Sequence, residues 1–214
     1  MNPRRYVSPS RDAAASHTRE RIVAAAAAIL GTSEGIDAFS LEAVAKRAGV
    51  TRLTVYNQFG SRRGVLEAVF DEMAARGGLH RLSGAMAHAD PYAALLEVIN
   101  IFSEFWSFDP GALARLHAAG SSNPEFAESD SERNELRRRL FAGLVRRIAK
   151  DRPLRAKAQR DLVDILFALS SFSFFSQLSI QGRTAAAACR MIQELAMDAV
   201  RRAVAGTQQT APDD

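Results

Sequence analysis

Apolar residues recur along most of the chain at the three-to-four-residue spacing that places them on one face of an α-helix. The first such segment carries Ile22, Val23, Ala26, Ile29 and Leu30. The strict alternation of apolar and polar positions that is typical of a half-buried strand is nearly absent. The pattern therefore predicts an all-α protein of about nine helices.

Short helices separated by glycines are predicted in the N-terminal third, after the first helix. A second helix begins after Ser40, a favourable N-cap residue, and closes at Gly49. Thr51 can cap a third helix over residues 52–59, and a fourth is predicted over 62–76. We expect one domain over residues 17–76, built on a three-helix helix-turn-helix arrangement.

Residues 77–205 are predicted to form a second, larger helical domain. Its first long helix begins at Pro91, and the segment 120–124, which reads Gly-Ser-Ser-Asn-Pro, is predicted to be a loop. A single penultimate helix is expected to end near Gly182. The next helix upstream has several arginines, Arg137 among them, which are expected on its solvated rim.

The chain has 214 residues, of which 47% are hydrophobic and 24% are charged, as in ordinary globular proteins. No window approaches the roughly 18 continuous apolar residues of a membrane-spanning helix. The segment Met1–Arg21 has no apolar stretch typical of a secretory leader. The single cysteine, Cys189, cannot form an internal disulfide. We therefore expect a cytoplasmic protein without a membrane partner.

Positive charge is concentrated near the N-terminus. Residues 1–65 hold ten Arg and Lys against five Asp and Glu, whereas the remaining residues hold 18 against 19. A localised basic segment suits a polyanion such as nucleic acid, although a solvated basic surface is the alternative. Residues 1–16 are expected to be a flexible basic arm, and residues 206–214 a disordered tail.

The two short helices over residues 40–59 are joined by a turn at Gly49, which is the pattern of a helix-turn-helix. The second helix of such a motif can enter the major groove of DNA. Arginine, asparagine and glutamine can each contact bases there, and hydroxyl groups can contact phosphates. The alternative is a helical hairpin that only packs, because short helix-Gly-helix segments are common.

Residues 19–73 contain further features in a fixed order. These are Arg21-Ile22 with an Ala-rich helix, Gly35, Phe39-Ser40-Leu41, Ala45 to Val50 (AKRAGV), Thr51, Thr54-Val55-Tyr56, Phe59, Gly60-Ser61-Arg62 and Leu66. In these features the chain resembles the DNA-binding domain of TetR-type transcriptional repressors. The helices that follow are similar in number and position to the ligand-sensing and dimerising domain of that family.

The resemblance implies a role for each matching residue. Ser40, Tyr56 and Arg62 would contact phosphates, whereas the first half of the third helix and Gln58 would face bases or adjoining backbone. Leu53 stands where a small residue or proline is usual, and Gln58 where histidine is frequent, so the operator sequence is open. The predicted DNA-contacting residues are Ser40, Thr51, Arg52, Leu53, Thr54, Tyr56, Asn57, Gln58 and Arg62.

Aromatic residues gather in the second domain and could line an apolar pocket with a few polar groups. A closed core is the alternative, because a helical domain must bury such residues in any case. The resemblance favours a small-molecule effector and a homodimer formed through the last two helices. The predicted ligand-binding residues are Ile99, Asn100, Phe102, Phe105, Trp106, Phe126, Phe141, Phe167, Phe172, Phe175 and Ser176.

Other chemistry is weakly indicated. Residues 31–35 match the nucleophile pattern G-x-S-x-G around Ser33, but that motif requires a preceding strand. The four histidines lack metal-ligand spacing, and no cofactor fingerprint is found. We therefore expect no enzyme, cofactor or metal, but a dimeric repressor that a small apolar or amphipathic molecule releases from a palindromic operator. The alternatives are a helical small-molecule-binding or scaffold protein without specific DNA binding and, remotely, a hydrolase with Ser33 as nucleophile.

Overall fold

The computed structural model describes residues 9–32, 34–122, 124–180 and 182–208. Within these ranges the chain forms eleven α-helices, one short 3-10 helix and no strand. The all-α prediction is confirmed, and two more α-helices are found than the nine expected. The additional ones arise because residues 82–86, ahead of the helix predicted from Pro91, form a helix of their own and because the predicted penultimate helix is two helices.

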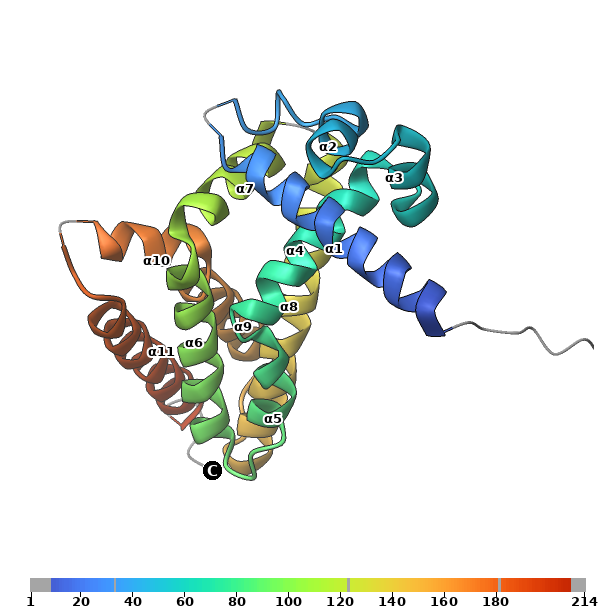
Figure 1. Cartoon of the computed structure of the whole chain (residues 1–214). Coiled ribbons are helices and arrows are strands. Elements are labelled where there is room, and N and C mark those ends of the chain that lie inside the picture. Colours follow the sequence, from blue (N-terminus) through green and yellow to red (C-terminus); the bar gives the residue numbers. More distant parts are fainter. Residues whose placement is uncertain (1–8, 33, 123, 181, 209–214) are drawn as a thin grey trace, which may run out of the picture.

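Four helices form the N-terminal end of the molecule, at the top of Figure 1. They are α1 (Pro9–Leu30), α2 (Leu41–Ala48), α3 (Arg52–Phe59) and α4 (Arg62–Arg76). α1 packs against α2 and α4, and α3 packs against α2 and α4. Because α1 begins at Pro9, residues 9–16 of the predicted flexible arm are helical, while residues 1–8 lie outside the described residues.

The remaining helices form the larger part of the molecule (Figure 1). They are η1 (Leu79–Arg81), α5 (Leu82–Met86), α6 (Pro91–Phe108), α7 (Pro110–Ser122), α8 (Pro124–Asp151), α9 (Ala156–Leu169), α10 (Phe172–Ser179) and α11 (Ala185–Gln208). The prediction of a loop over residues 120–124 is wrong, because α7 continues to Ser122 and α8 starts at Pro124, where proline suits a first helical turn. Of the predicted disordered tail, residues 206–208 belong to α11, and residues 209–214 are not described.

The predicted penultimate helix breaks between α9 and α10, which are bent by 51° relative to each other. Ser171 lies at the break, and its side chain caps α10 by accepting a hydrogen bond from the backbone N–H of Phe174 at 3.2 Å. A serine competes with helix continuation through such local bonds, which explains a break inside an apolar stretch.

Two buried clusters stabilise the fold. One joins α1 to α4 and also takes in Phe105 and Phe126 from the second part of the chain. The other joins α6, α8, α9 and α11. The apolar stripe of the last helix, including Ile192, belongs to this second cluster. That stripe therefore packs within its own chain.

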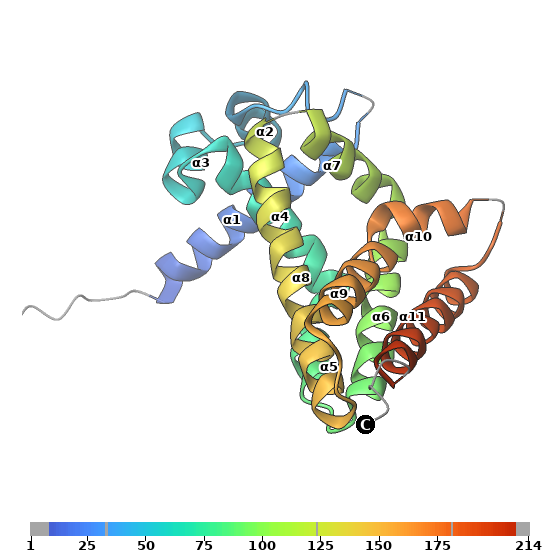
Figure 2. The same cartoon turned by 180° about the vertical axis from the view of Figure 1, so that it is seen from behind.

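α8 spans the length of the molecule and links its two ends. Its first half packs against α4 and α7, and its body packs against α9, as Figure 2 shows from behind. Across the described ranges, no single helix is long and apolar enough to cross a membrane, although the bent pair α9 and α10 passes this test together by length and composition.

Candidate nucleic-acid interface and pocket

The turn between α2 and α3 has the geometry that a helix-turn-helix requires. Gly49 adopts a left-handed conformation with φ of +66°, and its backbone N–H donates to the carbonyls of Ala45 and Lys46. A side chain at this position would be strained, which explains the glycine. Thr51 then caps α3, because its hydroxyl oxygen accepts a hydrogen bond from the N–H of Thr54 at 3.1 Å.

α3 is held by one side and open on the other. Val55 is completely buried against the N-terminal cluster, whereas Leu53 and Tyr56 are 66% and 56% exposed. Arg52 and Asn57 are exposed as well. These four residues, which are predicted to contact DNA, are therefore exposed to solvent. A helix anchored at Val55 presents a polar, solvent-facing edge of the size that a major groove accepts.

The remaining predicted contacts of this surface are less open. Thr54 and Gln58 are half-buried, and the Thr54 and Thr51 hydroxyls lie 2.8 Å apart. Ser40 is also half-buried and caps α2 by accepting from the N–H of Ala43 at 3.0 Å. Its hydroxyl keeps a donor, which can reach a phosphate oxygen at the N-terminus of α2.

Arg62, a predicted phosphate contact, also has partners within the protein. Its Nε donates to the carbonyl of Phe39 at 3.0 Å, and its Nη2 donates to the carbonyl of Ile36 at 3.1 Å. The guanidinium also lies over the rings of Phe39 and Phe126. Arg62 thus fastens the loop before α2 to α4 and α8, and its contact with a phosphate stays a prediction. The position of Arg62 at the start of a helix does not predict that its guanidinium group donates to carbonyls of a preceding loop.

Two arginines of α1 that were not predicted as site residues position the interface. Arg19 lies over the Phe59 ring at 4.5 Å and donates to the carbonyl of Gln58 at 3.5 Å. Arg21 donates to the carbonyl of Ala48, at the end of α2. Arginine at the C-terminus of a helix satisfies carbonyls that have no intrahelical partner. These contacts fix α2 and α3 on α1.

An ionic cluster connects the N-terminal helices to α8. Nε of Arg63 lies 2.6 Å from the carboxylate of Glu67, and its other nitrogens contact Glu128 and Glu132 of α8. Ser129 donates to Glu67 at 3.1 Å. The hydrogen bond from Arg63, followed by that from Ser129, lowers the pKa of Glu67, although burial opposes this shift.

A cavity of about 360 Å³ lies beside this junction. Its walls come from α4, η1, α5, α6, α7, α8, α9 and α10, and its size falls in the range of small-molecule pockets. Five of the predicted ligand-binding residues line it, namely Phe102, Phe105, Trp106, Phe167 and Phe172. The sequence could not decide between an open pocket and a closed core, and the structure has an opening among these side chains.

The other six predicted ligand-binding residues do not line this cavity. Ile99, Phe141 and Phe175 are buried in the second cluster, and Phe126 belongs to the first. Asn100 donates to Glu104 at 3.0 Å and accepts from the thiol of Cys189, while the hydroxyl of Ser176 donates to a carbonyl of its own helix. Apolar periodicity marks burial, but it does not distinguish a residue that packs in the core from one that faces the opening.

The sequence prediction did not include the polar side chains that line the cavity. They are Asp130, Arg133, Asn134 and Arg137 of α8, His117 of α7 and Ser171 before α10. The expectation that Arg137 lies on a solvated rim is wrong, because this side chain is only 9% exposed. The four α8 residues follow each other at spacings of three, one and three, which places them on one helical face, and this pattern was the available signal.

The last two candidate features are the nucleophile pattern around Ser33 and a metal site. Ser33 lies outside the described residues, and the segment before it is the helix α1, whereas the nucleophile pattern needs a strand there. Within the ranges that the structure describes, no three His, Cys, Asp or Glu side chains are grouped so that they could hold a metal ion.

Comparison with known proteins bears on the N-terminal helices first. Residues 22–69 match the sequence model of a family described as bacterial regulatory proteins, tetR family. This match concerns the N-terminal helices of the chain. The matched segment covers the helix-turn-helix, the C-terminal part of α1 and the N-terminal half of α4, so these helices match the DNA-binding domain of this family. A search of curated proteins gives no significant match.

The likeness in fold to solved structures extends over most of the chain. A candidate fatty acid metabolism regulator of Clostridium perfringens aligns over 84% of this chain and 97% of its own, with a TM-score of 0.65 at 16% identity. A TetR transcription regulator of Haloarcula marismortui aligns over 88% and 99%, with a TM-score of 0.62 at 15% identity. The multidrug binding protein EbrR, complexed with imidazole, aligns over 91% and 97%, with a TM-score of 0.54 at 20% identity. At these identities the likeness concerns the fold.

Proposed function

We propose that this chain is a dimeric, ligand-responsive repressor of the TetR type that binds a palindromic DNA operator. The observation that carries the proposal is the exposed edge of α3, where Arg52, Tyr56 and Asn57 project from a helix fixed by the buried Val55. Arginine and asparagine can read guanine and adenine in the major groove, and the tyrosine hydroxyl suits a phosphate.

The effector would bind in the 360 Å³ cavity, and α8 would carry its effect to the DNA-binding helices. Arg133 and Arg137 of α8 line the cavity, while Glu128 and Glu132 of the same helix pair with Arg63 of α4. Phe70 of α4 is itself part of the cavity wall. A ligand that favours one position of α8 relative to α4 would shift the spacing of the two recognition helices in a dimer.

The dimer would form through α9 and α11, which pack against each other. Ile165 of α9 is 40% exposed and Leu195 of α11 is 37% exposed, and these residues remain outside the internal core. A C2 dimer would place two recognition helices roughly 34–36 Å apart, one DNA turn. Ile165→Glu should raise the dimer dissociation constant in sedimentation equilibrium, and an unchanged constant would move the interface elsewhere.

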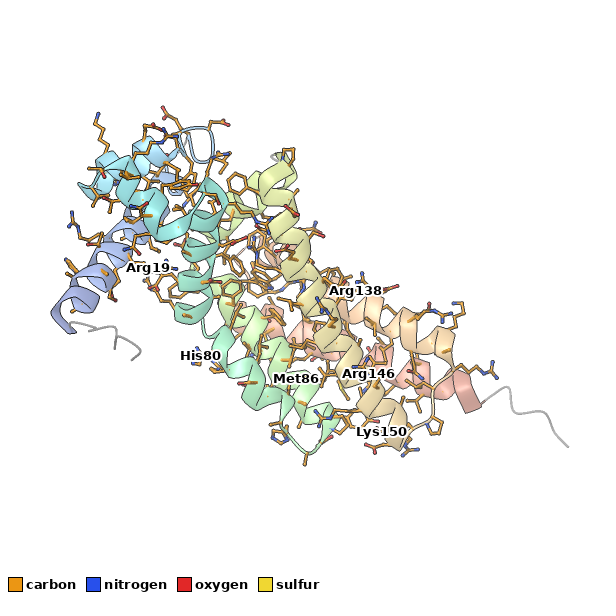
Figure 3. The ribbon with its side chains drawn as sticks, turned by 90° about the vertical axis from the view of Figure 1, so that its right-hand side faces the viewer. Arg19, His80, Met86, Arg138, Arg146 and Lys150 are labelled. Atoms are coloured by element: carbon orange, nitrogen blue, oxygen red, sulfur yellow. The ribbon has the colours of Figure 1, made fainter. Side chains whose placement is uncertain are left out.

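The DNA-binding proposal is tested by fluorescence anisotropy on DNA from the region upstream of the gene, over a series of salt concentrations. Arg52→Ala and Tyr56→Ala should each weaken binding by about 1–3 kcal/mol. Arg146→Gln, on the part of α8 remote from α3 (Figure 3), serves as the matched control and should leave affinity unchanged. Unchanged affinity of both α3 variants would support the alternative of a small-molecule-binding protein that does not read DNA.

A further inference from the structure

Two arginines of α8 lie one helical turn apart in the wall of the otherwise mainly apolar cavity. Arg133 and Arg137 both line it, together with aromatic rings such as Phe102, Trp106 and Phe172. Arg137 is only 9% exposed. A charged group is rarely buried so deeply unless it is paired, so these guanidinium groups require a physical explanation.

Aromatic stacking holds both guanidinium groups in place. The Arg133 guanidinium lies 4.1 Å from the centre of the Phe70 ring, and that of Arg137 lies 4.3 Å from the centre of the Phe167 ring. Arg137 also donates to the carbonyl of Ser170 at 2.9 Å and to Oδ1 of Asn134 at 3.1 Å. Stacking and these hydrogen bonds orient the side chains, but they supply no negative charge.

The two positive charges are incompletely compensated. In the part of the chain that the structure describes, neither guanidinium has a carboxylate within ion-pair distance, and the Nε atoms of both are buried without an acceptor. Asp130 is the acidic residue in the cavity wall, and its carboxylate accepts a hydrogen bond from Asn134 at 2.9 Å. Two guanidinium groups and one carboxylate leave the wall with a net charge of one positive unit.

Burial disfavours the charged form of both arginines. It lowers the pKa of Arg133, and it lowers the pKa of Arg137 to about 10, although Asp130 opposes both shifts. Arg138 adds to the lowering at Arg137, whereas Glu67, Asp71 and Glu132 oppose it at Arg133. A cavity that disfavours its own cations is stabilised by an anion placed beside them.

We propose that the cavity binds a hydrophobic organic monoanion, with a carboxylate at Arg133 and Arg137 and an apolar body among the aromatic rings. The carboxylate geometry matches the guanidinium fork, and one negative charge neutralises the excess charge of the wall. The proposal rests on the proposed function, because it names the chemical class of effector for the same pocket.

The test compares three probes that each have a ten-carbon chain but differ in charge, titrated into the full-length protein by isothermal calorimetry. Sodium decanoate should bind more tightly than decan-1-ol, and decyltrimethylammonium should bind most weakly. Loss of a charge-assisted hydrogen bond in the variants Arg133→Met or Arg137→Met should weaken decanoate about tenfold or more and leave decan-1-ol little changed. Arg146→Gln, an exposed arginine farther along α8 (Figure 3), should behave as the wild type.

The methionine variants are chosen because they should fold. A buried cation replaced by an apolar side chain of similar length is often neutral or stabilising. The carbonyl of Ser170 would keep the indole N–H of Trp106, which donates to it at 2.9 Å. Thermal melting of the ligand-free variants checks that they fold. If Arg137→Met does not fold, decanoate binding by Arg133→Met decides whether the anion proposal holds.

Decanoate binding that is no tighter than that of decan-1-ol, or that survives both methionine substitutions, overturns the anion proposal. Anisotropy with upstream DNA separates this result from the proposed function. If the protein binds DNA and a neutral or cationic compound releases it, the repressor proposal holds and the anion proposal is rejected. If decanoate binding depends on the two arginines but the protein has no affinity for DNA, the anion proposal holds and the repressor proposal is rejected.

Discussion

Oε1 of Glu42 lies 3.2 Å from Nε of Arg52, so an acidic residue of α2 pairs with the first residue of the recognition helix. Both side chains are 66% exposed, and an exposed pair of this kind contributes at most about 1 kcal/mol to stability. Under the proposed function its larger effect would be on DNA recognition, because a carboxylate at this edge repels phosphates and occupies the arginine that the groove would use.

Glu42→Gln should therefore strengthen DNA binding. Removing the carboxylate releases Arg52 for a phosphate or base contact, so the slope of log K against log salt should steepen by about one unit. Anisotropy titrations over a salt series measure both quantities, and Glu194→Gln on the exposed side of α11 is the matched charge control. Weaker binding by Glu42→Gln would mean instead that the ion pair positions Arg52 for DNA.

The turn of the helix-turn-helix can be tested with a pair of glycines. Gly49 has φ of +66°, and a Cβ there would lie 3.1 Å from Nη2 of Arg21, so Gly49→Ala should cost about 1–2 kcal/mol. Gly84 lies within α5, where a Cβ would meet no atom within 4 Å, so Gly84→Ala should gain about 0.5–1 kcal/mol. Urea denaturation of both variants measures the two differences. Equal effects would show that backbone conformation does not decide them.

The N-terminal helices could be predicted closely because their signals are local. Ser40 and Thr51 each cap the helix that the sequence assigned to them, and Gly49 ends α2 in the left-handed conformation expected of it. These features depend on neighbours within a few residues, so they can be read in order along the chain. The outward edge of α3 follows from them, because burial of Val55 determines which side is left open.

Long-range contacts account for what the sequence could not supply. Arg62 turns toward the carbonyls of Ile36 and Phe39, which are more than twenty positions earlier, and Arg137 reaches Ser170 across two helices. An arginine in an Arg-rich helix gives no sign of which tertiary partner it meets. Apolar spacing likewise identifies Phe141 as buried, but it does not say that the cavity opens beside Phe102 instead.

Arg62 should be a stability residue. Arg62→Ala removes hydrogen bonds to the carbonyls of Ile36 and Phe39 and uncovers the Phe126 ring, so we expect a loss of about 1–3 kcal/mol in urea denaturation. Arg62→Lys should recover only part of it, because an ammonium group cannot reproduce the planar fork. Arg52→Ala, an exposed arginine of the same domain, should stay within about 1 kcal/mol of the wild type. A loss in Arg62→Ala no greater than in Arg52→Ala would contradict the anchoring role.

The junction between α4 and α8 should weaken in acid. The hydrogen bond from Arg63 and then that from Ser129 lower the pKa of Glu67 below the ordinary value of about 4.3. A carboxylate whose pKa is lower in the folded state stabilises that state above its unfolded pKa, and this contribution is lost as pH falls through the lowered value. The free energy of unfolding of the wild type should therefore exceed that of Glu67→Gln near pH 7, and the difference should shrink toward pH 3. Arg63→Met, which removes the first cause of the shift, should reduce the pH dependence in the same way. Parallel pH curves for the wild type and Glu67→Gln in urea denaturation would rule out this linkage.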